Sequence, residues 1–136
     1  MYLLDTNVIS ELRKARPHGA VLAWVQKNHD VHLHLSAMTI AEIQVGIEIT
    51  REQNAPKAAE IEAWLDQLAN AYNVLPIDVP TARHAARLMH RRSSVLYEDA
   101  MIAATAQVHQ LVVVTRNTAD FDTFGVPLLN PFLAAA

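Results

Sequence analysis

Tyr2-Leu3-Leu4-Asp5-Thr6-Asn7 is the stretch of sequence that decides the fold. In it, three apolar residues are followed at once by a carboxylate, a hydroxyl and an amide. A short apolar run bounded by polar residues is typical of a buried strand, so we expect a strand over 2–4 that ends at Asp5. The end of a strand is also where α/β proteins place their binding crevices.

Along the rest of the chain, short strand-like segments alternate with segments whose apolar residues have helical spacing. Val31-His32-Leu33-His34-Leu35 alternates with period two, which indicates a strand. Asn54 and Pro56 mark the start of a helix, as cap and first-turn residue. The expected strands are 2–4, 31–35, 74–77, 111–114 and 126–129, and the expected helices are 8–14, 18–27, 39–49, 54–68, 80–92 and 99–109. This order predicts an α/β domain whose helices cover a mostly parallel sheet.

The composition fits one domain. The chain has 136 residues, of which 51% are hydrophobic and 18% are charged. No repeat or linker divides it, so we expect a single domain over 1–133 and a frayed tail over 134–136. The apolar excess suggests that some surface is covered by a partner.

The same composition excludes several classes of protein. The chain contains no cysteine, which rules out disulfides and thiolate metal sites. No apolar run approaches the ~20 residues that span a bilayer, and no secretory signal is visible, so we expect a cytoplasmic protein without membrane contact. The net charge of −3 means that any nucleic acid must be bound by a local basic patch.

Four acidic residues share one class of position. Asp5 and Asp120 follow strand-like runs, whereas Glu42 and Asp99 lie near the starts of helical runs. Chain that leaves the carboxyl ends of parallel strands lines one crevice, so we expect these acids to converge. Clustered carboxylates repel one another unless a cation offsets their charge. Oxygen-only ligands suit Mg²⁺ or Mn²⁺, as one or two ions, and the matching chemistry is phosphodiester hydrolysis by an activated water.

Each acid also has a purely structural interpretation. Thr39-Ile40-Ala41-Glu42 matches a capping box, and Asn117-Thr118-Ala119-Asp120 has a similar form. Asp5 fits a helix cap, and Asp99 complements a helix dipole. These interpretations explain the acids one by one, but they do not explain why all four fall at equivalent positions.

The acidic motifs resemble those of PIN-domain endoribonucleases, in particular the VapC toxins of VapBC toxin–antitoxin pairs and their FitB-like relatives. The resemblance covers nearly the whole chain. It rests on Tyr2 to Asn7, Leu35 to Glu42 with Gly46, Asp99 to Ala106, and Val113 to Asn117 with Asp120-Phe121. It implies a three-layer α/β/α PIN-like fold, a toxin activity of metal-dependent RNA hydrolysis, and Mg²⁺ or Mn²⁺ as cofactor.

The resemblance also implies roles for individual residues. Asp5, Glu42 and Asp99 match the family's metal-binding catalytic triad. Asn117 stands where many members carry a fourth, catalytic aspartate, so Asp120 is the candidate for the missing metal-binding carboxylate. Three neighbours are expected to support these ligands and one to bind substrate phosphate: Thr6, Asn7 and Thr115 for support, and Arg116 for phosphate.

Partners follow from the same resemblance. VapC-like proteins form homodimers, and a cognate antitoxin inhibits them within a larger complex that contacts operator DNA through the antitoxin. Because Asn117 adds no charge, an alternative function stays open: a weakly active or inactive PIN scaffold that binds an antitoxin and acts as a co-repressor. A nuclease directed at DNA is a further alternative, and the target RNA is left open.

Other polar residues carry weaker signals. Glu98 projects about 100° away from Asp99 on a helix, so we prefer Asp99 for the site. Glu11 fits a solvated helix face as easily as the site. His32 and His34 share one strand face, but no third ligand follows at a recognised spacing. Arg83, Arg87 and Arg91 recur every fourth residue, next to Arg92. This basic helix face fits a phosphate backbone or an ordinary solvated surface equally well. Tyr97, near Asp99, is placed either to pack or to stack on a base.

Overall fold

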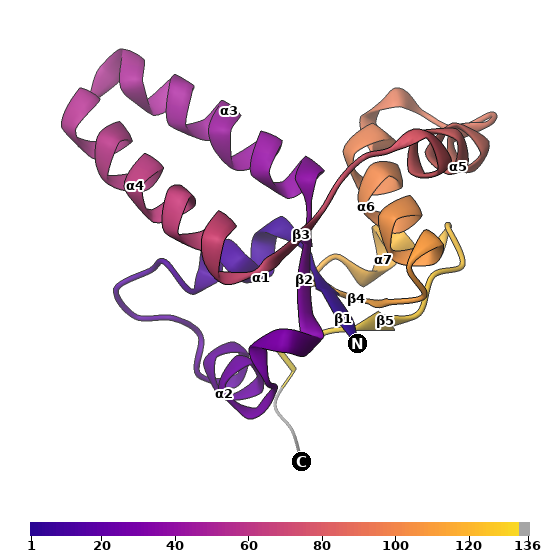
Figure 1. The fold of residues 1–136 in the computed structure, drawn as a ribbon, viewed down its shortest axis with the longest axis horizontal. Coiled ribbons are helices and arrows are strands. Elements are labelled where there is room, and N and C mark those ends of the chain that lie inside the picture. Colours follow the sequence, from indigo (N-terminus) through magenta and orange to yellow (C-terminus); the bar gives the residue numbers. More distant parts are fainter. Residues whose placement is uncertain (134–136) are drawn as a thin grey trace.

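A computed structural model of the protein describes residues 1–133 (Figure 1). Its strands are β1 (Tyr2–Leu4), β2 (Leu33–Ser36), β3 (Asn73–Leu75), β4 (Val112–Val114) and β5 (Leu128–Leu129). Its α-helices are α1 (Thr6–Glu11), α2 (Gly19–Lys27), α3 (Ala37–Gln53), α4 (Ala55–Ala71), α5 (Val79–Met89), α6 (Tyr97–Val108) and α7 (Thr118–Asp122). Two short 3-10 helices, η1 (Asp30–His32) and η2 (Ser94–Leu96), complete the described elements. The tail expected to fray, 134–136, lies outside the described residues.

The five strands form one sheet in the order β3-β2-β1-β4-β5. Every pairing is parallel, so the predicted mostly parallel sheet is in fact all parallel. The chain builds the sheet outward from β1 to β3 and then crosses to the other side of β1 to add β4. The strand order therefore reverses between β1 and β4, which is where α/β sheets open a crevice at their carboxyl ends.

Alternating side chains of the buried strands divide the core into two layers. Leu4 and Val114 face one side of the sheet and pack with residues of α1, α2, α3 and α4, including Ile9, Val21 and Ile47. Leu3 and Val113 face the other side and pack with α6 and α7 through residues such as Ile102 and Phe121. This alternation is the normal pleat of a strand that is buried on both faces. The predicted three-layer α/β/α architecture is confirmed.

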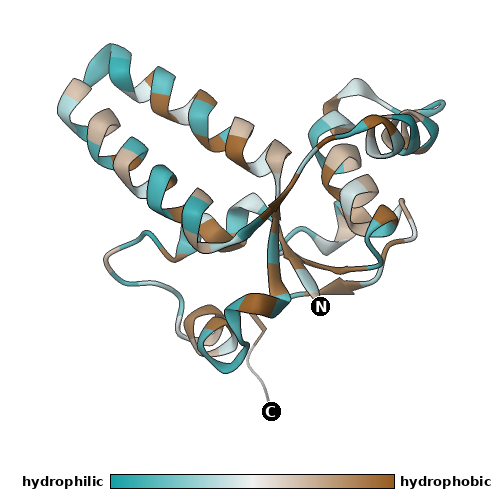
Figure 2. Ribbon diagram, viewed as in Figure 1, coloured by the Kyte–Doolittle hydropathy of each residue, from teal (hydrophilic) through white to brown (hydrophobic). Residues whose placement is uncertain are grey.

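The ribbon shows how these layers frame the sheet. The α3–α4 hairpin projects to one side of the strands' carboxyl ends, and α5 and α6 lie on the other side (Figure 1). Hydrophobic residues concentrate in the strands and on the inward sides of the helices, whereas hydrophilic residues dominate the outer turns of α3 and α4 (Figure 2). Within residues 1–133, no helix is both long and apolar enough to cross a membrane.

Several predicted boundaries were wrong. The strand expected over 31–35 begins only at Leu33, because Asp30–His32 forms a 3-10 helix capped by the His29 side chain. The segment after Asn117, left without a helix in the prediction, contains α7. Helix α3 begins before Thr39, and Ser36 is its cap, since Ser36 Oγ accepts a hydrogen bond from the Met38 amide at 3.0 Å. The capping-box interpretation of Thr39 and Glu42 is therefore wrong.

Candidate functional site

The site is built at the reversal of strand order. Asp5 directly follows β1, and Thr115 directly follows β4, the two strands that pair across this point. The Asp5 amide donates to the Val114 carbonyl at 2.9 Å, which extends the strand pairing by one residue. The Thr115 hydroxyl then donates to Asp5 Oδ2 at 2.8 Å. The sheet itself thus fixes both side chains at the base of the crevice.

Asp5 is buried and fully engaged with its neighbours. Only 4% of its surface is exposed. Its Oδ1 accepts from the Thr6 amide at 2.7 Å, so Asp5 caps α1 as one structural interpretation predicts. Its Oδ2 accepts from Asn7 Nδ2 at 3.1 Å as well as from Thr115. Burial raises the Asp5 pKa, the hydrogen bonds from Thr115 and Thr6 lower it, and the Asp120 charge raises it.

Glu42 reaches the same crevice from α3. It lies in the second turn of this helix, and its Oε1 accepts from the Thr6 hydroxyl at 3.0 Å. Burial raises the pKa of Glu42 to about 7, and the charges of Glu98 and Asp5 act in the same direction. Glu42 and Thr6 also line a cavity of about 270 Å³ between α1, α3 and α4. The side chain is therefore accessible from this cavity.

Asp99 and Asp120 complete the group of four predicted acids. Asp99 is the third residue of α6, and Asp120 the third of α7. Burial raises the pKa of Asp99 to about 6, and the charges of Asp5, Asp120 and Glu98 contribute to the rise. The negative charge of Asp120 raises the pKa values of both Asp5 and Asp99. The structure thus brings the four acids into one electrostatic group from four different elements.

Two further residues belong to this group although neither was predicted to be part of it. Glu98 was set aside in favour of Asp99, but its charge raises the pKa values of Glu42 and Asp99. Thr39 was assigned to a capping box, but it is buried and its Oγ1 lies 3.1 Å from Thr6 Oγ1. The sequence did hold one signal for Glu98, because it is the direct neighbour of Asp99.

The three residues expected to support the acids lie where that role requires. Thr6 contacts Glu42, and Thr115 contacts Asp5. Asn7 joins the two sides of the site, since its Nδ2 lies within hydrogen-bond distance of Asp5 and of Thr115 Oγ1 at 3.3 Å, and its Oδ1 accepts from the Arg116 amide at 3.2 Å. These contacts limit the orientations that the Asp5 carboxylate can take.

Asn117 and Arg116 lie at the exposed rim. The Asn117 amide donates to Thr115 Oγ1 at 3.0 Å, and its side chain makes no capping bond to α7. The Arg116 guanidinium lies 4.5 Å from the centroid of the Phe132 ring. Within residues 1–133 it forms no ion pair with any of the acids. Arg116 is thus near the site but is held by the carboxyl-terminal segment.

Glu11 is a structural residue. The solvated-face interpretation is wrong, because Glu11 is only 6% exposed. Its carboxylate accepts from Lys14 Nζ at 2.9 Å and from the His18 amide at 3.0 Å, and these contacts lower its pKa. Glu11 therefore fastens the turn between α1 and α2.

The donor set suits a hard divalent cation. It consists of carboxylate oxygens, with one amide oxygen nearby. Burial first, and then the neighbouring negative charges, raise the pKa values of Glu42 and Asp99, and a bound cation would favour their charged forms. Among residues 1–133, no three His, Cys, Asp or Glu side chains already converge on one point as ligands. The chemistry of the residues fits Mg²⁺ or Mn²⁺, and binding would need the carboxylates to move closer together.

Two known proteins match this chain over nearly its whole length. The chain is 38% identical to a VapC ribonuclease of Sinorhizobium fredii over 97% of this chain and 98% of that protein. It is 34% identical to the toxin FitB of Neisseria gonorrhoeae, over 97% and 99% of the two chains. Residues 2–126 match the PIN domain. The chain belongs to the PIN-domain family.

Solved structures of PIN-domain proteins resemble it along the whole length. The crystal structure of FitAcB from Neisseria gonorrhoeae matches with a TM-score of 0.85 at 34% identity, covering 97% of this chain and 99% of that one. A structure of FitAB bound to a DNA fragment also matches with a TM-score of 0.85, at 32% identity, covering 100% and 99%. The predicted PIN-like fold and the resemblance to VapC and FitB proteins are thereby confirmed.

Proposed function

We propose that this PIN-domain protein is a cytoplasmic, Mg²⁺- or Mn²⁺-dependent endoribonuclease that acts as the toxin of a toxin–antitoxin pair. The observation that carries the proposal is the coupled group of Asp5, Glu42, Asp99 and Asp120 at the reversal of strand order. Burial and neighbouring negative charges raise the pKa values of Asp5, Glu42 and Asp99, so this arrangement of carboxylates serves stability poorly. It serves well to hold a hard cation against an RNA phosphate.

Asp5, Glu42 and Asp99 would hold the cation, with Asp120 as the fourth carboxylate and Asn117 supplying a neutral carbonyl oxygen. A bound divalent ion supplies a polarised phosphoryl oxygen and a water of lowered pKa. Because Asn117 adds no negative charge, Asp120 would have to supply the fourth negative charge of the site. Both residues count as part of the catalytic set.

The surrounding residues would hold the carboxylates in their orientations before RNA binds. Thr115 and Asn7 hold the Asp5 carboxylate, and Thr6 orients Glu42. Preset orientation lowers the cost of assembling ligands around a metal. The cation of Arg116, next to the acids, would bind a substrate phosphate after leaving the Phe132 ring.

The proposal includes protein partners. Relatives solved as FitAcB and as DNA-bound FitAB are complexes. By analogy, this chain would form a homodimer and a larger complex with a cognate antitoxin, and it would reach operator DNA only through that antitoxin. The cavity beside Glu42 is one place where a cationic side chain of the antitoxin would enter and inhibit the site.

The test is cleavage of unstructured and structured RNA by partner-free protein in Mg²⁺, in Mn²⁺ and in EDTA. Asp5→Asn and Asp99→Asn are the informative variants, and Asp66→Asn, on the exposed face of α4, is the matched control. We expect metal-dependent cleavage of RNA, and we expect its rate to fall at least about a hundredfold in the two site variants, because each lacks a catalytic carboxylate. Equal cutting by all four proteins, or cutting that persists in EDTA, would refute the proposal.

One observation favours a second function. Asn117 replaces a carboxylate, and the acids do not converge as ligands within residues 1–133. A scaffold that binds an antitoxin and assists repression would need only the acidic charge. The co-repressor function would replace the nuclease if two results are obtained together. RNA cleavage would be absent, and the chain would increase the affinity of the antitoxin for operator DNA in a way that Asp5→Asn weakens.

A further inference from the structure

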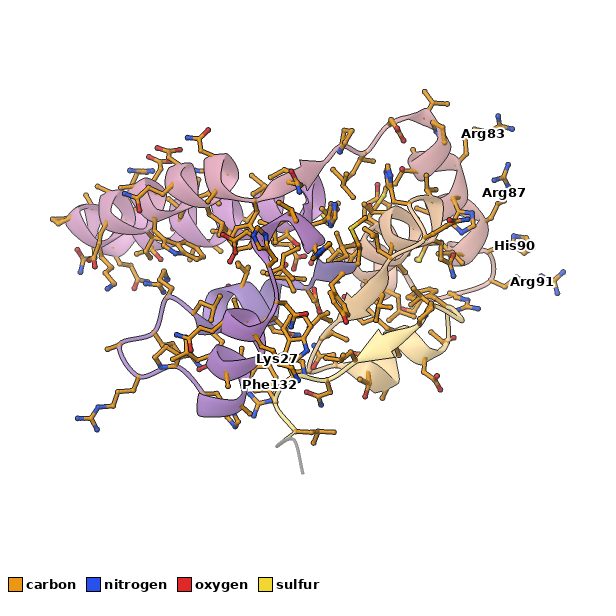
Figure 3. The ribbon with its side chains drawn as sticks, turned by 60° about the horizontal axis from the view of Figure 1, so that its bottom comes forward. Lys27, Arg83, Arg87, His90, Arg91 and Phe132 are labelled. Atoms are coloured by element: carbon orange, nitrogen blue, oxygen red, sulfur yellow. The ribbon has the colours of Figure 1, made fainter. Side chains whose placement is uncertain are left out.

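Helix α5 and the two residues after it carry a row of basic side chains that the proposed chemistry does not use. We call Arg83, Arg87, His90 and Arg91 the α5 stripe. All four are exposed. Figure 3 shows them in a row along one edge of the molecule, directed away from the ribbon. The sequence left this row undecided between a phosphate contact and an ordinary solvated face.

The α5 stripe has no partners of its own. Among the described residues, none of its side chains forms an ion pair or a side-chain hydrogen bond, whereas Arg51 pairs with Glu48 and Glu62 and Arg92 binds Thr123. Like charges one helical turn apart destabilise a helix. A helix dipole favours cations in the last turn, which accounts for Arg87 but not for Arg83, the fifth of the eleven residues of α5. Neither local effect explains the row as a whole.

The backbone at Arg91 points the same way. Arg91 has a φ of 61°, in the left-handed region, just beyond the end of α5. Glycine is the usual residue at such a position, because a Cβ is strained there. The chain thus keeps an exposed cation where stability alone would favour glycine.

The α5 stripe adjoins the first turn of α6, the helix that carries Asp99. His90 and Tyr97 line the same cavity of about 460 Å³, between α5 and the first turn of α6. Tyr97 is exposed and lies two residues before Asp99. Most of the remaining lining is alanine and methionine, including Ala86 and Met89. An RNA strand that leaves Asp99 around the start of α6 would pass Tyr97 and then meet the stripe.

Charge decides between possible occupants. The chain has a net charge of −3, and its site is acidic, so an RNA backbone is repelled wherever a cation does not offset the carboxylates. An aromatic surface leading to unpaired cations is the arrangement that single-stranded nucleic acid uses, with bases stacked and phosphates paired. An acidic protein segment would use the cations but would have no need of the adjoining Tyr97 surface.

We propose that the α5 stripe binds the phosphate backbone of the single-stranded RNA segment that continues from the acidic site past Tyr97. This proposal rests on the proposed nuclease. It makes the α5 stripe a determinant of substrate length, because only an RNA extending beyond the cleaved bond reaches it.

The experiment uses the triple variant Arg83→Gln, Arg87→Gln, Arg91→Gly. The matched control is Lys27→Gln, Arg51→Gln, Lys57→Gln, which removes the same charge from α2, α3 and α4, away from the stripe (Figures 1 and 3). The probe is a labelled unstructured RNA of about 20 nucleotides, whose binding is measured in EDTA across a salt series and whose cleavage is measured in Mn²⁺. Thermal unfolding checks both proteins, and Arg91→Gly is expected to leave stability equal or higher because glycine suits the positive φ.

We expect the stripe variant to bind the RNA at least about tenfold more weakly, with a salt slope lower by about 2, since each contact on a single strand contributes ~0.7. Its KM should rise by a similar factor while kcat stays unchanged, and the control should match the wild type. Wild-type binding, slope and KM in the stripe variant would overturn the proposal, as would unchanged RNA binding with weakened binding of an acidic partner protein. Absence of any RNA binding or cleavage by the wild type would instead reject the nuclease itself.

Discussion

At the scale of single residues, the site depends on how Asp5 is held. Asp5 is the capping residue of α1 and also the most buried of the acids. Its two oxygens accept three hydrogen bonds, so its orientation is fixed before any ligand binds. The structural and the functional interpretation of Asp5 are therefore compatible, because one side chain does both.

Thr115→Val tests this arrangement. Valine keeps the shape of threonine but removes the hydroxyl that lies 2.8 Å from Asp5 Oδ2. Because that hydrogen bond lowers the Asp5 pKa, its loss should raise the pKa further and weaken cation binding. We expect cleavage to fall about 10–100-fold, as for other partners of metal ligands. Thr115→Ser retains a hydroxyl and should recover most of the activity; equal losses in both variants would contradict this role.

The raised pKa values predict an unusual pH dependence of stability. The pKa of Glu42 is about 7 in the folded protein against an ordinary 4.5, and that of Asp99 is about 6 against 3.8. Between these values the folded chain binds more protons than the unfolded chain, so its stability falls as pH rises. Thermal unfolding in EDTA should give a lower Tm at pH 8 than at pH 5.5.

Asp99→Asn is the matched variant for this effect. Removing the charge should stabilise the metal-free protein at pH 8 by on the order of 1 kcal/mol, a value reduced because water screens a half-buried carboxyl. At pH 5.5, where the wild-type carboxyl is largely protonated, the gain should shrink. A Tm of the wild type that rises from pH 5.5 to pH 8, with no gain in the variant, would show that the acids do not repel each other.

Sequence reasoning at this scale located the four main acids but not all their neighbours. Asp5, Glu42, Asp99 and Asp120 were found because each stands beside the start or end of an element. Glu98 was set aside because a step of ~100° on a helix separates it from Asp99. That reasoning considered α6 alone, whereas Glu98 meets Glu42 of α3. Contacts between distant elements leave no periodic signal in the chain.

At the scale of elements, the cap of α3 links the sheet to the site. Ser36 ends β2 and caps α3, and its hydroxyl lies 3.3 Å from that of Thr105 in α6. The cap thus sets the direction in which α3 carries Glu42. Asn54 ends α3 and caps α4 at the far end of the hairpin, where its Oδ1 accepts from the Lys57 amide at 3.0 Å.

Ser36→Ala and Asn54→Ala form a matched pair. Each removes one capping bond and should lower the free energy of unfolding by about 1 kcal/mol. Only Ser36→Ala should also lower RNA cleavage, by several fold, because only that cap lies at the crevice end of α3. Urea unfolding and cleavage rates of the two variants check this; an equal loss of cleavage in both would show that activity follows stability rather than the position of α3.

Elements were predicted where one pattern dominates locally. The apolar runs at 2–4 and 111–114 and the capped helix after Asn54 appear close to the expected positions. The predicted strand over 31–35 was too early because His29 caps a 3-10 turn, a local hydrogen bond that the alternation of His32 and His34 conceals. Helix α7 was missed because its five residues are too few to show helical spacing.

At the scale of the whole molecule, the order of strands explains how the acids meet. The predicted α/β class required helices on both faces, and the two layers of core residues agree with it. The strand order β3-β2-β1-β4-β5 was not predictable from spacing, since several orders satisfy the same alternation of elements. Only this reversal beside β1 brings Asp5, Thr115 and α6 to one crevice.

The most direct test of the metal site does not depend on knowing the RNA. It is a calorimetric titration of Mn²⁺ into partner-free protein at pH 6 and pH 8, with Asp99→Asn and the surface control Asp66→Asn alongside. We expect binding in the wild type and the control, tighter at pH 8 and with proton release at pH 6, because carboxylates must lose protons to bind a cation. Asp99→Asn should lose most of this affinity. Equal affinity in all three proteins, or no binding by the wild type at either pH, would contradict a metal-dependent acidic site.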